Sequence, residues 1–395
     1  MIVQEKAVQA QALLSETGLD CWMTFGRESG IHPDPGIDMI IGLDITWISA
    51  FLFMKDGRRV AIVGRYDVSN IQSTGVFQEV LSYDEGIRPL LLATLARLDP
   101  RQIGLNFCTD DSTADGLTHG MWVLLNNLLR ESPFAARLTS AAPLLAKLRA
   151  RKSPSEIERI KKAVQTTEEI VKLTSEIIRP GLSELQIADF IHDQFRARGL
   201  PSAWDWAACP IVNSGPASIA GHGKPQASIF VEPGHLVHID LGVKQDGYCS
   251  DLQRMWYILR PGETGPPESV QRGFDTVLRA IDAGAAVLKP GVRGFEVDAA
   301  ARRVVVDAGY EEFKHAFGHG LGRAVHDGGT MLGPHWEKYG KTPDGIIEPG
   351  NVFTLELGVN TEAGYIGLEE DVLVTPNGCE VLSSFQRELK LIKNS

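Results

Sequence analysis

The chain has 395 residues, which is too long for one ordinary hydrophobic core and predicts two domains. Hydrophobic residues make up 43% and charged residues 23% of the sequence, and these near-average values exclude a disordered, collagen-like or coiled-coil protein. Aspartate and glutamate outnumber lysine and arginine by 50 to 39, and the resulting net charge of −11 argues against a nucleic-acid partner.

The amino terminus and the apolar segments predict a cytoplasmic protein. The first ten residues lack the basic start and apolar stretch of a signal peptide. The most apolar segment, residues 39–54, contains Asp44 and is too short to span a bilayer, so we expect no membrane partner. The five cysteines are widely spaced without a CxxC pair, which predicts reduced thiols rather than disulfides or a thiolate metal site.

Residues 1–150 alternate helical and strand signals and predict an amino-terminal α/β domain without a catalytic cluster. The expected elements, in chain order, are a helix over 3–16, a strand over 21–25, a hairpin over 47–63 turning at Asp56-Gly57, a helix over 88–98, a strand over 102–107 and a helix over 117–129.

A second domain, residues 151–395, begins with a helix-start signal. Ser153 can cap a helix, Pro154 fits its first turn, and Glu156 completes a capping box.

This second domain contains an internal repeat. The motif RPGL at 179–182 is echoed by KPGV at 289–292, and each precedes the same apolar spacing on one helical face. A closer echo relates residues 232–243 to residues 348–359. Two echoes in the same order predict an α+β domain of two similar halves related by a pseudo-two-fold axis.

The first half carries a pair of acidic residues on a predicted hairpin. A loop over residues 244–247 would place Asp240 directly opposite Asp251, with Cβ atoms about 5 Å apart. A tighter turn at Asp246-Gly247 would make the two carboxylates diagonal neighbours instead. In both registers like charges share one face, and such a pair requires a cation between them.

The second half repeats this arrangement, with Glu356 at the position equivalent to Asp240. A loop over residues 361–364 places Glu356 opposite Glu369, whereas a shift of one residue would select Glu370. Because side chains alternate between faces, only one of these neighbours joins Glu356, and the hairpin pattern leaves both open. Asp240 and Glu356 lie inside the apolar runs LVHIDLGV and VFTLELGV, where an unpaired charge is unfavourable.

A nitrogen ligand is available in the segment FGHGLG, in which glycines flank His319 and allow close approach of the backbone. Four carboxylates and one imidazole make a hard, oxygen-rich site. Such a site suits two divalent cations, which we expect to be manganese, with cobalt, iron or zinc as alternatives.

These motifs resemble the metallopeptidases of the pita-bread fold, which include Xaa-Pro dipeptidase (prolidase), Xaa-Pro aminopeptidase, methionine aminopeptidase and creatinase. The resemblance runs from Ser153 to the carboxyl terminus, through HIDLG, GYCSD, GHGLG, TLELG and LEEDVLVT. The extra amino-terminal domain resembles the prolidase, aminopeptidase P and creatinase branch, which implies a homodimer. Counting back from Thr375 as in the family selects Glu369 over Glu370. The implied metal ligands are Asp240, Asp251, His319, Glu356 and Glu369.

Further side chains match family positions around the substrate. His222 in AGHGKP and His326 in RAVHD resemble the histidine pair that donates hydrogen bonds to the scissile amide and its tetrahedral intermediate. Trp206 could wall the substrate pocket, and an aromatic core patch explains it equally well. His238 should share the face of Asp240 and pack behind it rather than bind metal.

The sequence also departs from the family. Gly367 stands where Xaa-Pro peptidases usually have an arginine two residues before the last ligand, and TLELG replaces the usual TxEPG. These departures leave the dipeptide specificity open.

The resemblance implies hydrolysis of the Xaa-Pro amide bond in short peptides by a hydroxide that bridges two cations. Glu356 would take the proton of the water, while His222 and His326 would stabilise the oxyanion. One alternative is a creatinase-like hydrolase of a small non-peptide amide or guanidine. A non-catalytic pita-bread binding module ranks last, because such modules generally lose ligands.

Overall fold

The computed structural model describes residues 2–218 and 223–393, and the chain divides into two compact units, Met1–Arg149 and Ala150–Ser395. Each unit contains its own sheet and its own hydrophobic cores. No helix in these described ranges combines the length and the apolar character needed to cross a membrane.

Unit 1 is built on a six-stranded mixed sheet with the order β4-β3-β2-β1-β5-β6. The helices and strands expected from the sequence are present, and their ends differ by a few residues at most. The short strands β4 and β6, which pair in parallel at the two edges, were not expected. The elements are α1 (Ile2–Thr17), β1 (Cys21–Gly26), α2 (Pro35–Ile40), β2 (Ser49–Met54), β3 (Arg59–Gly64), α3 (Val68–Ser73), β4 (Glu79–Tyr83), α4 (Arg88–Leu98), β5 (Ile103–Leu105), α5 (His119–Leu128), β6 (Leu138–Ser140) and α6 (Ala142–Ala150).

Helices cover both faces of this sheet. Successive strand residues point to opposite faces, and apolar residues occur on both. Trp22 of β1 enters a core with α1, α2 and α6, whereas its neighbours Cys21 and Met23 enter a core with α4 and α5. This packing confirms the predicted α/β class of the amino-terminal part.

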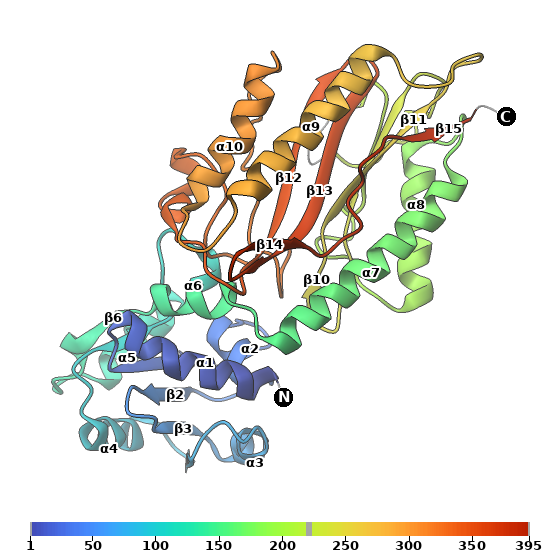
Figure 1. The fold of residues 1–395 in the computed structure, drawn as a ribbon. Coiled ribbons are helices and arrows are strands. Elements are labelled where there is room, and N and C mark those ends of the chain that lie inside the picture. Colours follow the sequence, from blue (N-terminus) through green and yellow to red (C-terminus); the bar gives the residue numbers. More distant parts are fainter. Residues whose placement is uncertain (1, 219–222, 394–395) are drawn as a thin grey trace. The chain divides into compact units, whose positions relative to one another are not determined.

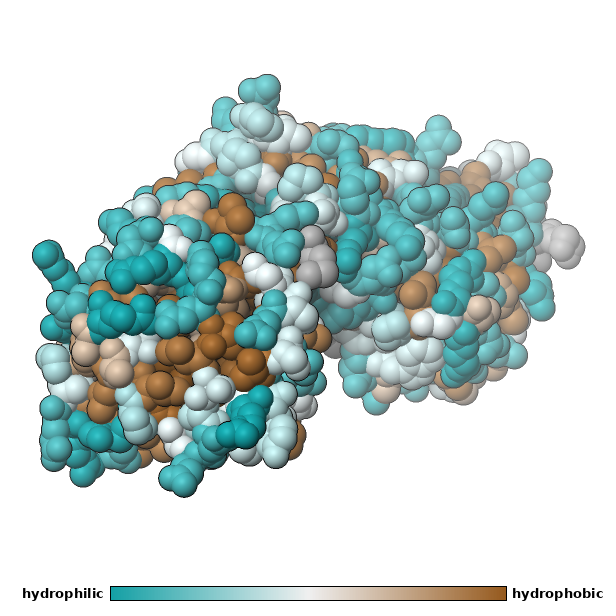
Figure 2. Space-filling model, turned by 90° about the horizontal axis from the view of Figure 1, so that it is seen from below, coloured by the Kyte–Doolittle hydropathy of each residue, from teal (hydrophilic) through white to brown (hydrophobic). Residues whose placement is uncertain are grey.

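Unit 1 also presents apolar side chains to solvent. Figure 2 shows hydrophobic residues gathered on the face of this unit that is turned to the viewer. Its most exposed large apolar side chains include Tyr66 (78%), Ile31 (70%) and Val8 (66%). None of these residues belongs to the predicted metal site.

Unit 2 contains a seven-stranded sheet in which the order β12-β13-β11-β8-β7 is extended by β14 beside β13 and β15 beside β11 (Figure 1). Four helices pack on it. The elements are α7 (Pro154–Ile177), α8 (Glu184–Arg198), β7 (Ile211–Ser214), β8 (Leu236–Leu241), β9 (Lys244–Gln245), β10 (Tyr248–Cys249), β11 (Leu252–Ile258), α9 (Glu268–Val287), α10 (Gly294–Asp307), β12 (Val352–Thr361), β13 (Gly364–Thr375), β14 (Gly378–Val381) and β15 (Lys390–Ile392).

The internal repeat predicted from the sequence is confirmed. Helices α7 and α8 share a core with β7, β8 and β11, and α9 and α10 share a second core with β12 and β13. The two halves also repeat a backbone contact, since Gly181 donates to the carbonyl of Val231 and Gly291 to that of Ile347, both at 2.9 Å. Both glycines have positive φ angles, +88° and +90°, which favour glycine at these turns.

The amino terminus of α7 has the capping interactions expected from the sequence. Oγ of Ser153 accepts a hydrogen bond from the backbone of Glu156, whose carboxylate accepts one from the backbone of Ser153. This capping box fixes where the first helix of unit 2 begins.

Candidate metal centre

The first acidic hairpin closes through a tight turn. Across it, Tyr248 pairs with Gln245, and Asp246 and Gly247 both adopt positive φ angles of +50° and +84°. Gln253 therefore faces Asp240 in the β8–β11 register, and Asp251 lies diagonal to Asp240. The prediction of a wider loop with the two aspartates directly opposite is wrong, because an Asp-Gly pair readily forms a two-residue turn. The tighter alternative is the observed one, and it keeps both carboxylates on one face.

The second hairpin has the predicted register. Asn360 pairs with Tyr365, and Glu356 pairs directly with Glu369. Glu370 points to the opposite face, where its carboxylate lies 3.0 Å from Nη2 of the buried Arg254. The alternation of β13 thus directs Glu369 towards Glu356 and Glu370 away from it.

His319 lies in a segment that is pinned against β12. Glu356 donates from its backbone nitrogen to the carbonyl of Phe317 at 2.8 Å, and Thr354 donates to the carbonyl of His319 at 3.0 Å. A Cβ atom at Gly318 would lie 2.0 Å from the carbonyl oxygen of Thr354, so this close approach requires glycine. The segment carries the imidazole to the two hairpins, with Nε2 3.7 Å from both Oδ2 of Asp251 and Oε1 of Glu356.

The donor atoms are arranged as a metal site requires. Asp251, His319 and Glu369 offer ligand atoms that all lie within 4.8 Å of one another. In the described part of the chain, one buried carboxylate oxygen on each of Asp240, Asp251 and Glu369 has no hydrogen-bond partner. Unpaired buried carboxylate oxygens are unfavourable, and a divalent cation would satisfy them. The residues present therefore fit a metal.

Burial and mutual repulsion shift the pKa values of the side chains in this cluster. Burial raises the pKa of Asp240 to about 7 and, with the adjacent charge of Asp240, raises the pKa of Glu356 to about 8. Burial and neighbouring carboxylates also raise the pKa values of Asp251 and Glu369 well above the ordinary range. Burial lowers the pKa of His319 to about 3, so its imidazole is neutral and free to bind metal.

Two supporting residues were missed by the sequence reasoning. Oδ2 of the buried Asp371 accepts a hydrogen bond from the backbone nitrogen of Asp251 at 3.0 Å. The amide of Gln253 contacts the carboxylates of both Glu356 and Glu369. Asp371 lies two residues beyond Glu369 on β13, and Gln253 lies two residues beyond Asp251, which directly precedes β11. Alternation places each beside a predicted ligand, but it does not mark either as a supporting residue.

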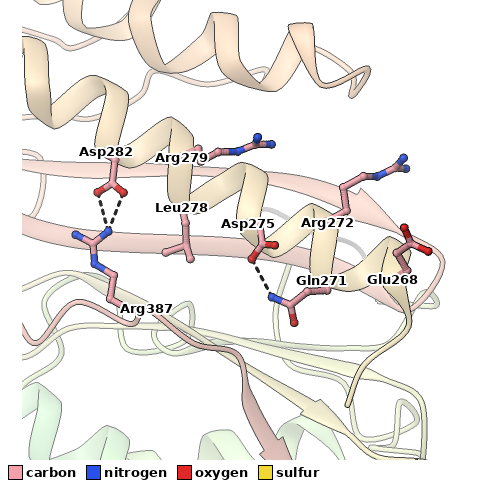
Figure 3. A pocket seen from close by; sticks show the side chains of 8 residues that line it. All are labelled: Glu268, Gln271, Arg272, Asp275, Leu278, Arg279, Asp282 and Arg387. Atoms are coloured by element: carbon pink, nitrogen blue, oxygen red, sulfur yellow. Dashed lines mark hydrogen bonds and ion pairs between the residues drawn. The ribbon is translucent and has the colours of Figure 1, made fainter. Parts of the chain in front are cut away.

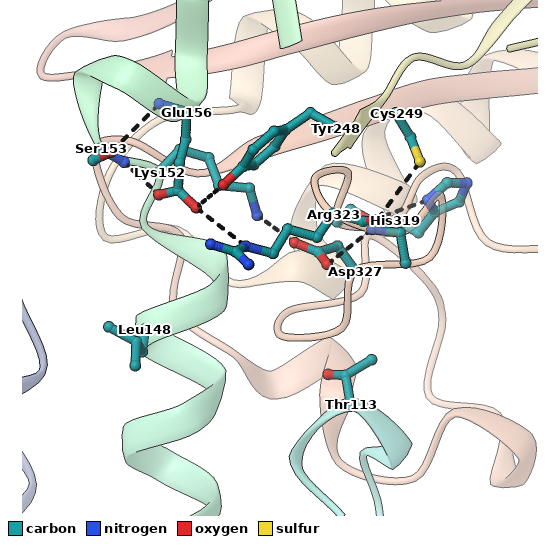
Figure 4. Close-up of polar contacts among 12 residues, drawn as sticks. Thr113, Leu148, Lys152, Ser153, Glu156, Tyr248, Cys249, His319, Arg323 and Asp327 are labelled. Atoms are coloured by element: carbon teal, nitrogen blue, oxygen red, sulfur yellow. Dashed lines mark hydrogen bonds and ion pairs between the residues drawn. The ribbon is translucent and has the colours of Figure 1, made fainter. Parts of the chain in front are cut away.

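Of the predicted substrate histidines, His326 is described and His222 lies outside the described residues. The ring of His326 is exposed and stands perpendicular to that of His319, with centroids 4.4 Å apart. The next residue, Asp327, forms a buried ion pair with Nζ of Lys152 at 2.8 Å (Figure 4). This pair braces the loop that carries both imidazoles, since Asp327 also donates from its backbone to the carbonyl of Gly320.

Trp206 and His238 occupy different surroundings. Trp206 stacks on His192 of α8, with centroids 4.2 Å apart and planes inclined by 13°, and its predicted contact with substrate stays a prediction. His238 is buried behind Asp240 and hydrogen-bonds to Gln253, which is the packed position expected for it.

A separate hollow of about 650 Å³ lies along α9, and Figure 3 shows its mainly charged and polar lining. Asp282 pairs there with Arg387, and Gln271 bonds to Asp275. None of the predicted site residues lines this hollow.

The pKa shifts predict how stability depends on pH when metal is removed. Unfolded Asp and Glu titrate near pH 4, whereas folded Asp240 and Glu356 hold their protons to about pH 7 and 8. The stability that this proton binding provides is complete below about pH 4, decreases as the pH rises above 4, and is fully lost only above the folded pKa values of about 7 and 8. The lowered pKa of His319 acts in the opposite direction only below about pH 6.5, where unfolded histidine gains its proton.

We therefore expect the Tm of chelated protein to fall between about pH 6.5 and 8.5, with a change of about 2–4 °C for each kcal/mol lost. Saturating Mn²⁺ should remove the fall, because ligands that release protons bind metal more tightly at higher pH. Differential scanning calorimetry with and without chelator measures this. A level Tm in chelated protein would contradict the described charge cluster.

Comparison with known proteins places this chain in a family. Residues 158–376 match the model of metallopeptidase family M24. The chain is 29% identical to the uncharacterised peptidase YqhT of Bacillus subtilis over 280 residues, which is 70% of this chain and 73% of that protein.

Two solved structures are similar over nearly the whole chain. An Xaa-Pro dipeptidase from Bacillus anthracis is 25% identical with a TM-score of 0.75, and the match covers 99% of this chain and 100% of that one. An X-Pro aminopeptidase from Thermotoga maritima is 26% identical with a TM-score of 0.74, covering 97% and 100%. They bear out the predicted pita-bread fold with its internal repeat. The family match covers more than half of the chain, and the protein therefore belongs to metallopeptidase family M24.

Proposed function

We propose that this metallopeptidase hydrolyses the Xaa-Pro amide bond at the amino terminus of dipeptides or short peptides, using two divalent cations. The observation that carries the proposal is the convergence of acidic side chains from both halves of unit 2 on one imidazole, His319. Similar solved chains include an Xaa-Pro dipeptidase and an X-Pro aminopeptidase, which support this substrate class.

The residues that would hold the cations come from both hairpins and the pinned loop. When bound, two divalent cations supply Lewis acidity and an activated water nucleophile. The oxygen-rich donor set supports manganese over softer metals. The proposed ligands are Asp240, Asp251, His319, Glu356 and Glu369.

Glu356 is suited to move the proton of the nucleophile. Its side chain is 22% exposed, whereas those of His319 and Asp251 are 9% and 8% exposed, so it lies on the more open side of the cluster. A carboxylate on this open side can accept the proton of the attacking water, as general base catalysis requires.

The two histidines would act on the substrate itself. His326 is exposed beside His319, from where its ring could donate a hydrogen bond to the scissile amide or the developing oxyanion. We assign His222 the same kind of role from the family resemblance, and Trp206 a place in the pocket wall. We also propose that the protein is a homodimer, as in the prolidase branch, and that it works in the cytoplasm, where its free cysteines would stay reduced.

The substrate class is tested by presenting Mn²⁺-loaded protein with Xaa-Pro, Xaa-Pro-Yaa and Xaa-Ala peptides in parallel. We expect cleavage after Xaa in the proline peptides and loss of cleavage with chelator. Cleavage of the dipeptide alone identifies a dipeptidase, and cleavage of the longer peptide identifies an aminopeptidase. Metal-loaded protein that cleaves neither proline peptide would contradict the proposal and favour the small non-peptide amide or guanidine substrate of the creatinase-like alternative.

Replacing Glu356 by alanine should abolish turnover while the fold remains. The substitution removes a ligand and a proton acceptor, and loss of general base catalysis alone lowers rates by about 10²–10⁴-fold. Steady-state kinetics and circular dichroism measure the two effects, with the exposed hairpin residue Glu362→Ala as the matched control that keeps activity. Activity retained by metal-replete Glu356→Ala would rule out the assigned role.

A further inference from the structure

The buried amide of Gln253 lies at the centre of the acidic cluster. On the sheet, Gln253 is the direct neighbour of Asp240 on one side and of Glu369 on the other. Its Nε2 donates to Oε2 of Glu356 at 3.0 Å and to Oε2 of Glu369 at 2.9 Å. One NH₂ group therefore bridges two carboxylates that belong to opposite strands of the second hairpin.

The orientation of this amide is fixed from behind by His238. With cations bound, Glu356 and Glu369 would be ionised and could only accept hydrogen bonds, so Nε2 of Gln253 faces them and Oε1 faces away. Oε1 lies 2.9 Å from Nε2 of His238, which then donates to it. On its other side, Nδ1 of His238 lies 3.0 Å from Oδ1 of Asn213. A neutral imidazole that donates from Nε2 accepts at Nδ1, so the amide of Asn213 must then turn its NH₂ group towards Nδ1. The rings of His238 and Tyr365 are perpendicular, with centroids 5.1 Å apart.

This arrangement fills the space next to Gly367. A Cβ atom at residue 367 would lie 2.6 Å from Oε1 of Gln253, 2.6 Å from Cε1 of Tyr365 and 3.0 Å from Nε2 of His238. A side chain there would displace the hydrogen-bonded pair. The glycine at position 367 thus leaves the space that the hydrogen-bonded pair of Gln253 and His238 occupies.

We propose that Gln253 is a positioning residue for the metal centre, held in its donating orientation by His238, in the space that Gly367 leaves open. Gln253 keeps Glu356 and Glu369 at a fixed separation without itself binding metal. The inference rests on metal binding at the site of the proposed function, and it holds whichever substrate the enzyme cleaves.

The test is the affinity of the full-length protein for Mn²⁺, measured by isothermal titration calorimetry. Gln253→Met preserves the size of the side chain and removes its hydrogen bonds. Loss of such outer partners weakens metal binding by about 10–100-fold, and we expect a loss in this range. His238→Leu, which leaves every carboxylate in place, should weaken binding in the same direction by a smaller factor.

The double variant Gln253→Met/His238→Leu shows whether the two residues affect Mn²⁺ affinity through one interaction or independently. If His238 acts through Gln253, the double variant binds Mn²⁺ as Gln253→Met does, because the second substitution has nothing further to remove. Multiplied losses in the double variant would overturn the coupling. Affinity unchanged in His238→Leu would overturn the proposal even where Gln253→Met fails to fold.

Gln386 supplies a matched control, since it is another buried glutamine whose amide bonds only to backbone atoms of Met255 and Glu388. Gln386→Met should lower Tm while leaving the affinity for Mn²⁺ unchanged. An equal loss of affinity in this control would show that any buried amide matters, and would overturn the specific role of Gln253. Full metal binding without peptide cleavage in the unsubstituted protein would contradict only the proposed substrate.

Discussion

Electrostatic repulsion among carboxylates in one small space is the constraint on which the rest of unit 2 depends. Burial raises the pKa values of Asp240, Asp251, Glu356 and Glu369, and neighbouring charges raise those of the last three further. The folded chain therefore holds these groups in their charged form only at a cost in free energy. Bound divalent cations would offset that cost. The fold holds the carboxylates so close together that they repel one another unless a cation lies between them. The same constraint explains why a neutral imidazole, rather than a further charge, completes the cluster.

The pseudo-symmetric fold supplies the rigidity that this repulsion demands. Each half contributes a hairpin, and the strand registers bring both hairpins to one face of a single sheet. Backbone hydrogen bonds tie the His319 segment to β12, and the buried pair of Lys152 and Asp327 braces the loop beyond it. Strands thus position the proposed ligands Asp240, Glu356 and Glu369, Asp251 directly precedes β11, and a pinned glycine-rich segment positions His319.

Much of this arrangement could be predicted from the sequence, because period-two alternation in apolar strands reports which side chains share a face. For Glu356, the alternation left both Glu369 and Glu370 open as partners, and the family resemblance selected Glu369. The register of Asp240 stayed open as well, since loop length at an Asp-Gly turn changes the pairing while preserving the face. Gln253 and Asp371 were missed because an amide or an acid becomes a supporting residue only through three-dimensional contacts. The parallel edge strands of unit 1 are too short to carry a clear pattern.

Anomalous diffraction at the manganese edge, from crystals grown with Mn²⁺, tests directly whether the two hairpins and His319 form one site for two cations. We predict two anomalous peaks, each within bonding distance of side chains from this cluster, with Gln253 beside the ligands and outside the coordination shell. A single peak, or peaks placed away from Asp240, Asp251, His319, Glu356 and Glu369, would contradict a dinuclear centre.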